Sequence, residues 1–231
     1  MLPMTVPLVP DEGWGVLHLF CKVTPSTDGE AITRAVKAAE EVGQQVVCFA
    51  ILGHKADVGV MVVGPDLVAL RRTQSAVVHP GLELSASYVS LTEVSEYARG
   101  IPAERLDPRL HPTLPPSGKR AICFYPMSKR RDGEDNWYRL DYERREALMR
   151  EHGVTGRKFT GRVLQLVTGS TGIDDFEWGV TLFATAPDDL KQCVYKMRFD
   201  EVSARYAEFG PFYTGVVAPV EEVLSLCGVS Q

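Results

Sequence analysis

The chain has 231 residues, 45% of them apolar and 24% charged, which is enough for a sizeable core in one large domain or two small ones. The formal net charge is −5, and no apolar run reaches the roughly 18 residues of a membrane-spanning helix, so neither nucleic acid nor a membrane is expected as a partner. Five scattered cysteines without a C-x-x-C pair favour free thiols in a reducing, cytoplasmic environment. The Pro-rich residues 1–12 lack the basic and apolar regions of a signal peptide.

The first half alternates between strand and helix patterns. Short apolar, β-rich runs bounded by turn residues predict strands, whereas the spacing of Ile32, Val36, Ala39 and Val42 is typical of a helix face. In chain order we expect a strand, a helix, two strands, a helix and a strand, over residues 13–23, 28–42, 44–52, 58–63, 66–77 and 82–91.

The second half repeats this order after a Pro-rich connector over residues 101–118. The same patterns predict a strand, a helix, two strands, a helix and a strand over 119–127, 141–152, 162–168, 178–185, 188–199 and 212–217. The two halves are also alike in sequence, because the segment that starts at Asp57 and the one that starts at Glu177 both run acid, apolar, Gly, Val, strand, Pro, acid, Leu. Their offset is 120 positions.

This repeat predicts an α+β fold of two ferredoxin-like βαββαβ units, whose sheets pack into a barrel-like body, a dimeric α+β barrel within one chain. The expected domains are an N-terminal arm (1–12), an N-terminal half (13–100), the connector (101–118) and a C-terminal half (119–231). A cavity between one sheet and its helices would be the natural ligand site.

A strand over 119–127 would place Cys123, Tyr125 and Met127 on one face. Because this strand leads into Lys129 and the arginines that follow it, the face would form an apolar pocket with a cationic rim. The alternative for Tyr125 is a half-buried sheet tyrosine with a bonded hydroxyl.

Charge is concentrated in the same region. Residues 119–162 carry 12 Lys or Arg against 7 Asp or Glu, a local excess of five positive charges in an acidic protein. This excess suggests a small anionic ligand, and the alternative is a solvated helix face with i,i+4 ion pairs.

His152 follows Leu148 and Met149 at helical spacing, so it should share their inward face. We expect the helix to end here, with Gly153 as its C-cap. A histidine in the last turn often stabilises the helix dipole, but an imidazole that faces an apolar cavity can also ligate heme iron. His111 lies in the connector, where a mobile loop would bring it to a site.

Three further polar residues are candidates. Gln165 interrupts an apolar strand, so it points either to solvent or into the cavity as a neutral hydrogen-bond donor. Arg198 and Ser203 lie at the end of the last predicted helix, where they would either pair locally or hold a carboxylate.

Several motifs together resemble the coproheme decarboxylase branch of the chlorite dismutase-like family. They are Tyr-Pro-Met-Ser-Lys-Arg-Arg (125–131), Asp-Asn-Trp-Tyr (135–138), Glu-Arg-Arg (143–145), Met-Arg-Glu-His-Gly (149–153), Asp-Asp-Phe-Glu-Trp-Gly-Val (174–180) and Met-Arg-Phe-Asp-Glu-Val-Ser-Ala-Arg (197–205). The resemblance is dense over residues 120–220 and looser in the first half. It implies a homopentamer that binds iron-coproporphyrin III (coproheme) in the C-terminal half, and a transient contact with a ferrochelatase.

The implied reaction uses hydrogen peroxide to decarboxylate two propionates of coproheme to vinyls, which gives heme b. By resemblance, His152 is the axial iron ligand and Tyr125 forms the radical that takes hydrogen from the propionate, while Lys129 assists at the second propionate. The resemblance also implies that Met127, Gln165, Arg198, Ser203 and Arg131 contact the substrate.

Two other functions remain as alternatives to the decarboxylase. A non-catalytic heme carrier or sensor would need His152 but neither Tyr125 nor Lys129. A chlorite dismutase-like heme peroxidase would carry an arginine on the distal side, where this chain has Gln165. Some decarboxylases use a connector histidine there, so either Gln165 or His111 would assist peroxide cleavage.

Overall fold

The computed structural model describes residues 6–98 and 100–230, and its first half follows the predicted order. Its strands are β1 (Gly15–Lys22), β2 (Gln45–Ile51), β3 (Val58–Gly64) and β4 (Glu83–Thr92), and its helices are α1 (Gly29–Glu41) and α2 (Leu67–Val78). Asp28 and Asp66 begin the two helices, because each carboxylate accepts a backbone N–H of the first turn.

The second half contains the predicted elements and several short additions. The predicted ones are β5 (Ala121–Lys129), α4 (Tyr142–Arg157), β8 (Val163–Gly169), β9 (Trp178–Ala184), α5 (Pro187–Met197) and β11 (Tyr213–Val217). The additions are α3 (Ala103–Leu110) in the connector, β6 (Arg131–Asp132), β7 (Asp135–Asn136), η1 (Trp137–Arg139), α6 (Glu201–Tyr206), β10 (Ala207–Phe209) and α7 (Val220–Leu226).

The strands of the two halves join into one antiparallel sheet. Within the described residues its order is β10-β5-β11-β2-β3-β1-β4-β8-β9, and β9 also pairs with β5, so the order returns on itself. The halves are joined where β11 pairs with β2 and where β4 pairs with β8. The predicted α+β class is therefore confirmed, and a closed strand order is what two ferredoxin-like sheets joined at both edges would give.

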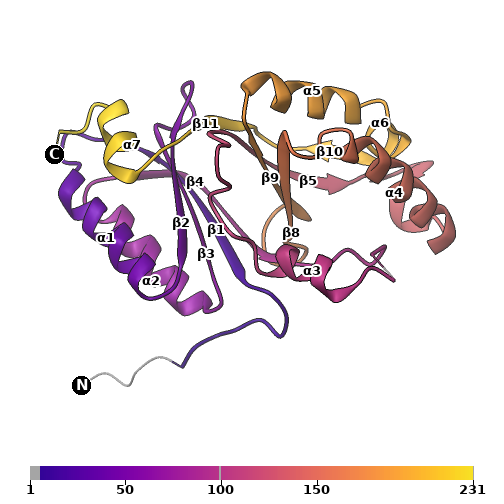
Figure 1. Cartoon of the computed structure of the whole chain (residues 1–231), viewed down its shortest axis with the longest axis horizontal. Helices are drawn as coiled ribbons and strands as arrows, with labels where there is room; N and C mark the ends of the chain where they lie inside the picture. Colours follow the sequence, from indigo (N-terminus) through magenta and orange to yellow (C-terminus); the bar gives the residue numbers. More distant parts are fainter. Residues whose placement is uncertain (1–5, 99, 231) are drawn as a thin grey trace.

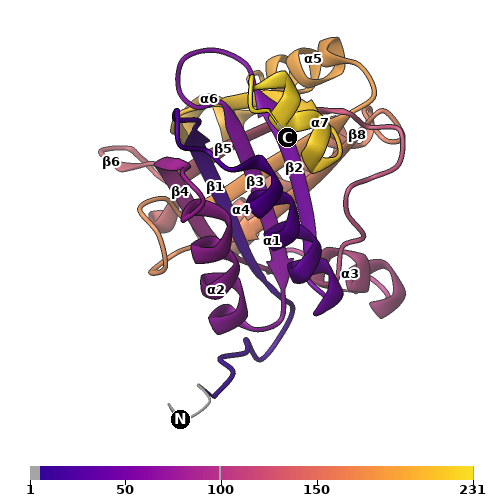
Figure 2. The same cartoon turned by 90° about the vertical axis from the view of Figure 1, so that its left-hand side faces the viewer.

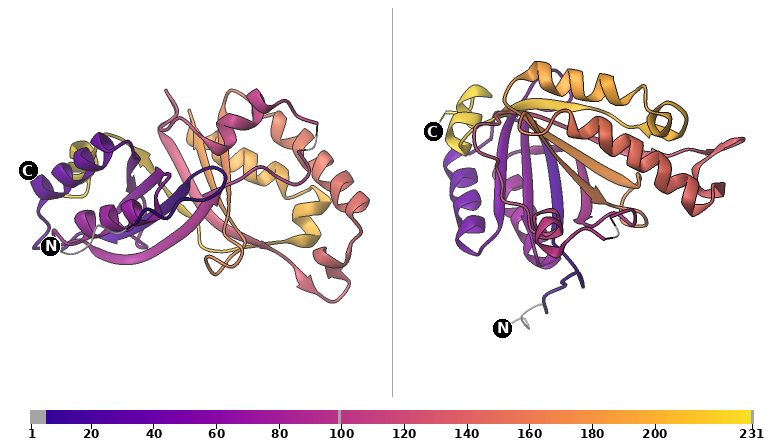
Figure 3. Two further views of the ribbon diagram at one scale, coloured as in Figure 1. Left: turned by 90° about the horizontal axis from the view of Figure 1, so that it is seen from below. Right: turned by 45° about the vertical axis from the view of Figure 1, so that its right-hand side comes forward.

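Helices cover the outer faces of the strands (Figure 1). Figure 2 shows α1 and α2 over the strands of the first half, and Figure 3 shows α4 and α5 on one side of the strands of the second half. Helix α7, although it comes from the C-terminal end, packs with α1 on the strands of the first half. No helix in the described part of the chain is long and apolar enough to cross a membrane.

Alternation along the strands separates the core into layers. In β5, Ile122 and Phe124 point into the apolar cluster between the two halves, whereas Cys123 and Tyr125 join the cluster beneath α5. This confirms the predicted face of Tyr125. All five cysteines are free thiols, as predicted.

Helix α4 does not end where the sequence predicted. The expected end at His152 with Gly153 as C-cap is wrong, because α4 continues to Arg157. Residues beyond Gly153 are held by tertiary contacts: the Thr155 hydroxyl donates to Asp200, and Phe159 is buried against α5. These contacts outweigh the low helix propensity of glycine.

Candidate functional site

Strand β5 carries Tyr125, Met127 and Lys129 on the face toward the helices of the second half. Tyr125 is 4% exposed and its ring stacks on Phe212 with centroids 4.5 Å apart. Burial raises the pKa of its phenol, and the nearby Arg198 opposes that shift. Among the described residues, none hydrogen-bonds to its hydroxyl. Tyr125 is therefore a protonated phenol in an apolar setting whose O–H has no partner in the described part of the chain.

Lys129, at the end of β5, is a buried cation. Its residue is 6% exposed, and its ammonium lies 4.6 Å from the centroid of the Trp137 ring, a cation–π contact. Burial lowers the pKa of Lys129 to about 8, and the charge of Glu177 partly counteracts this. Lys129 can thus gain or lose its proton near neutral pH.

His152 lies on the inward face of α4, one turn after Leu148, as predicted. Its Nδ1–H donates to Asp200 Oδ2 over 3.1 Å, and the Thr155 hydroxyl donates to the other carboxylate oxygen over 2.8 Å. Burial, followed by the charge of Lys129, lowers the pKa of His152, and Asp200 counteracts both. The lowered pKa favours the neutral imidazole, and its Nε2 has no hydrogen-bond partner among the described residues.

This arrangement suits an iron porphyrin. Metal-bound histidines commonly donate their second ring nitrogen to a carboxylate, which fixes the tautomer and leaves the other nitrogen for the metal. His152 and Asp200 present this donor set. A single imidazole supplies one ligand, and in a heme the porphyrin supplies four more.

Gln165 lies on the same face of the sheet as Tyr125. It pairs with Leu182 of β9, which pairs on its other side with Cys123 of β5, and directly opposed residues share a face. Strand spacing places Gln165 roughly 12 Å from Tyr125. Its side chain is exposed, although α5 contacts the neighbouring β9.

Arg198 follows α5 directly as its C-cap, and Ser203 lies within α6. The guanidinium of Arg198 is 3.9 Å from the centroid of the Phe209 ring and acts electrostatically on Tyr125. Ser203 is buried, and its backbone N–H donates to Asp200 O. Met127 is half-buried in the cluster of Tyr125, whereas Arg131 is largely exposed, 3.9 Å from Glu177.

His111 is not brought to this group. It follows α3, where its Nδ1 bonds to Asp107 and its ring packs edge-on against Trp14, with centroids 4.9 Å apart. None of its recorded contacts is with Tyr125, Lys129 or His152.

Most of the Lys and Arg residues that make up the basic excess over residues 119–162 form ion pairs. These include Arg144 with Glu201, Arg145 with Glu96, Arg150 with Glu146 and Arg162 with Asp189. The alternative of a solvated, ion-paired helix face therefore explains much of the excess. Lys129 differs from these residues because its cation is buried.

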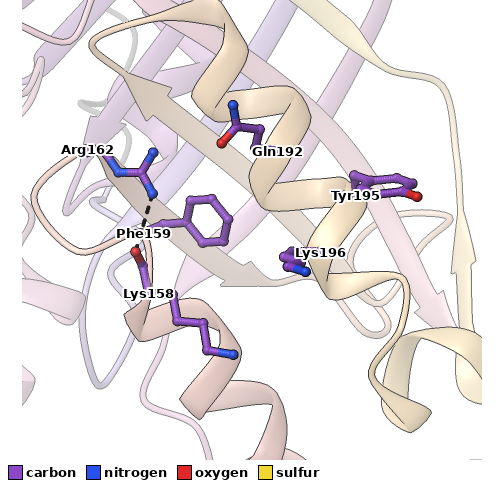
Figure 4. Close-up of a pocket in the computed structure, with 6 residues that line it drawn as sticks. All are labelled: Lys158, Phe159, Arg162, Gln192, Tyr195 and Lys196. Carbon is purple, nitrogen blue, oxygen red and sulfur yellow. Dashed lines mark hydrogen bonds between the residues drawn. The ribbon is translucent and has the colours of Figure 1, made fainter.

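Two surface cavities lie near this region. One of about 300 Å³ lies between the end of α4 and α5 and is lined by Lys158, Phe159, Arg162, Gln192, Tyr195 and Lys196 (Figure 4). The other, of about 340 Å³, is lined by Arg131, Asn136, Tyr138, Thr171 and Glu177. The first contains none of the predicted site residues, and the second reaches Arg131.

The sequence did not predict the partners of the site residues. Asp200, Trp137 and Glu177 contact His152 and Lys129 from positions 8 to 48 residues away along the chain. All three lie within the motifs quoted above, which is the one signal that would have drawn attention to them.

Comparisons with known proteins show which family the chain resembles. The family model described as chlorite dismutase matches residues 27–218. A coproheme decarboxylase of Thermus thermophilus is 38% identical over 94% of this chain and 95% of its own length. A Natronomonas pharaonis protein named as heme-binding is also 38% identical over 97% of this chain, which spans only 42% of that relative's length.

A solved structure agrees with these relatives. The structure of a heme-binding protein from Thermus thermophilus superposes with a TM-score of 0.84 at 38% identity, and covers 97% of this chain and 99% of its own. The chain belongs to the chlorite dismutase family.

Proposed function

We propose that this protein is a coproheme decarboxylase, which uses hydrogen peroxide to convert coproheme to heme b in the last step of coproporphyrin-dependent heme biosynthesis. The observation that carries the proposal is the carboxylate-bonded His152 close to the buried cation of Lys129, which lies on the same strand face as Tyr125. The relative of that name, 38% identical over 94% of the chain, supports it.

The reaction removes two propionates in turn. Each propionic acid side chain, CH₂CH₂COOH, reacts with one hydrogen peroxide to give a vinyl group, carbon dioxide and two molecules of water. Peroxide is reduced by two electrons, and the side chain is oxidised by two. The bound iron supplies the redox chemistry that cleaves peroxide.

Tyr125 carries out the hydrogen transfer. A phenol that releases one electron and one proton together becomes a neutral radical, and this radical takes a hydrogen atom from the propionate β-carbon. The bond to the carboxyl carbon then breaks and carbon dioxide departs, and the second electron would go to the oxidising equivalent that peroxide supplies at the bound iron. The unpartnered hydroxyl of Tyr125 leaves its O–H free for the substrate.

The remaining residues bind and orient the substrate. His152 would hold the iron through Nε2, and Gln165 would assist peroxide cleavage. Lys129 assists at the second propionate, where its buried ammonium would attract a carboxylate strongly.

Four further residues complete the proposed site. Arg198, Ser203 and Arg131 contact propionates, and Met127 packs against the porphyrin edge. The product carries two fewer carboxylates, so loss of these contacts favours its release.

The two alternatives predict different products. A heme carrier or sensor requires His152 alone, and it gives no account of a buried lysine and tyrosine beside it. A chlorite dismutase-like peroxidase is disfavoured by the neutral amide of Gln165, which cannot supply the positive charge of an arginine.

The proposal also covers the oligomeric state of the protein, its partner protein and its location in the cell. We expect a homopentamer that receives coproheme through a transient contact with a ferrochelatase. A cytoplasmic location agrees with five free cysteines, four of which are buried.

The test is a titration. Purified protein is mixed with ferric coproheme, hydrogen peroxide is added in small steps, and porphyrin masses are read by liquid chromatography and mass spectrometry. The proposal predicts a three-propionate intermediate and then heme b, with one peroxide consumed per propionate. Tight binding followed only by bleaching of the porphyrin would reject it in favour of a carrier or a general peroxidase.

A further inference from the structure

Glu177 is a buried carboxylate beside the end of strand β5. It is 6% exposed and immediately precedes β9. Its backbone N–H donates to the carbonyl of Met127 over 3.1 Å, which fixes the residue against β5. A carboxylate inside a protein is unfavourable unless hydrogen bonds and charges compensate for lost water.

Three groups compensate it. The backbone N–H of Lys129 donates to Oε2 over 2.7 Å, and the guanidinium of Arg131 lies 3.9 Å from Oε1. The phenol of Tyr138 lies near the carboxylate, because burial and then the Glu177 side chain raise the pKa of Tyr138. Arg131 and Tyr138 line the 340 Å³ cavity together with Glu177, so the outer side of the carboxylate faces a polar cleft and its inner side faces β5.

The hydrogen bond from the Lys129 N–H to the Glu177 side chain continues the strand pairing beyond the last paired residues of β5 and β9. The pairing of β5 with β9 ends at Met127 opposite Trp178, so the N–H of Lys129 has no strand partner on that side. The Glu177 side chain accepts this N–H instead. On the other edge Lys129 pairs with Ala207 of β10, and its ammonium lies over Trp137. The backbone of Lys129 is thereby held on both sides.

We propose that Glu177 is a positioning residue for Lys129: it fixes the end of β5 so that the ammonium stays in its place over Trp137. This rests on the proposed function, in which Lys129 acts at the second propionate. Glu177 does not touch the substrate. Its effect passes through the backbone of Lys129, and Arg131 and Tyr138 hold the carboxylate in place.

The test separates the two decarboxylations. Glu177→Ala, Glu177→Gln and Lys129→Met are loaded with coproheme, and the rates of the first and second steps are measured by mass spectrometry at matched peroxide. In Glu177→Ala the first step should stay within about twofold and the second should slow by about tenfold or more, as expected for a misplaced group. The three-propionate porphyrin then accumulates, as in Lys129→Met. Glu177→Gln keeps an acceptor oxygen and should restore most of the second step.

Asp189 provides the matched control. It is also a buried carboxylate paired with an arginine, Arg162, at 2.5 Å, and it lies away from Lys129. Asp189→Ala should leave the ratio of the two rates unchanged. If Glu177→Ala does not fold, Tyr138→Phe decides, because Tyr138 is half exposed and its phenol neighbours the Glu177 carboxylate. It should slow only the second step.

The outcomes distinguish the two claims. If Lys129→Met stalls and Glu177→Ala does not, or if Glu177→Ala slows both steps equally, the positioning proposal is wrong and the proposed function stands. Where Glu177→Ala does not fold, a Tyr138→Phe protein whose ratio of the two decarboxylation rates is unchanged would also show that the positioning proposal is wrong. If Lys129→Met completes both steps at the wild-type rate, Lys129 has no special part in the second step, and the positioning proposal is wrong with it.

Discussion

His152 and Asp200 are hydrogen-bonded at 3.1 Å between helix α4 and the turn before α6, with Thr155 bonded to the second carboxylate oxygen. A carboxylate at this position fixes the imidazole tautomer and its ring orientation. Asp200 therefore determines that Nε2 is the nitrogen presented to a ligand.

Asp200→Asn should weaken the binding of ferric coproheme by about 10- to 100-fold, because an amide holds the Nδ1–H less strongly and orients the ring less well. Absorbance titration of the Soret band measures this. Asp57→Asn is the control, since Asp57 pairs with Lys22 in the first half of the chain. Unchanged affinity and spectrum in Asp200→Asn would show that Asp200 does not orient an iron ligand.

Gln165, rather than His111, should assist peroxide cleavage, because Gln165 shares a sheet face with Tyr125 whereas His111 packs on Trp14. Gln165→Leu should slow the peroxide-dependent step by about tenfold, the loss of one hydrogen bond. His111→Ala should stay near the wild-type rate in the same stopped-flow assay. The reverse result would mean that the connector rearranges on substrate binding.

The buried Lys129 should make stability depend on alkaline pH. Its folded pKa of about 8 lies below the ordinary lysine value of 10.5, so the unfolded chain binds more protons between these values and stability rises with pH there. The cost of burying the charge is full below pH 8 and lost above pH 10.5. The stability gained in Lys129→Met relative to wild type should therefore shrink by about 2 kcal/mol between pH 7 and pH 9.5.

Denaturant unfolding of both proteins at each pH measures this difference. The control is Lys37→Met, because Lys37 is an exposed lysine paired with Glu221, and its difference from wild type should stay constant. A constant difference for Lys129→Met as well would mean that its ammonium is hydrated in solution.

His18 should make the protein sensitive to acid. It lies between the two halves, with Nε2 bonded to the Thr181 hydroxyl over 3.0 Å and Nδ1 unpartnered, and burial lowers its pKa to about 3. Since the folded pKa lies below the ordinary value of 6.5, stability present above pH 6.5 is lost as the pH falls toward 3. Between pH 7 and pH 5, His18 should account for about 2 kcal/mol of this loss.

The comparison is between His18→Leu and the exposed His79→Leu. His18→Leu should be less stable than wild type at pH 7, because the Thr181 hydroxyl loses its partner, but its stability should fall less steeply toward pH 5. His79→Leu should keep the wild-type slope. Equal slopes in all three proteins would locate the acid sensitivity elsewhere.

The sequence predicted the strand elements and faces well, because a strand's faces follow directly from alternation. Tyr125 and Phe124 lie on opposite faces of β5 as the pattern indicated. The end of α4 was misplaced, since Gly153 is a local signal and the contacts of Thr155 and Phe159 that extend the helix are not local. Tertiary packing outweighs propensity in such cases.

The site could be predicted only in part for the same reason. The sequence alone marks His152, Tyr125 and Lys129 as candidates by their residue types. Only the fold brings Asp200 and Glu177 into contact with His152 and Lys129. The orientation of Gln165 was ambiguous, because a polar residue in a strand can point to either face of the sheet. Its pairing with Leu182 puts it on the same face as Tyr125. The basic excess did not single out Lys129, since most of its members form ion pairs and only the fold shows which cation is buried.

The most direct test of the account is the reaction of Tyr125→Phe with ferric coproheme and hydrogen peroxide, followed by mass spectrometry of the porphyrins. Phenylalanine keeps the ring packing on Phe212 and removes the O–H that the reaction uses. The account predicts that coproheme binds with nearly wild-type affinity, that peroxide is consumed and that all four propionates remain. Conversion to heme b at the wild-type rate would contradict it, because the hydrogen atom would then be taken by another group.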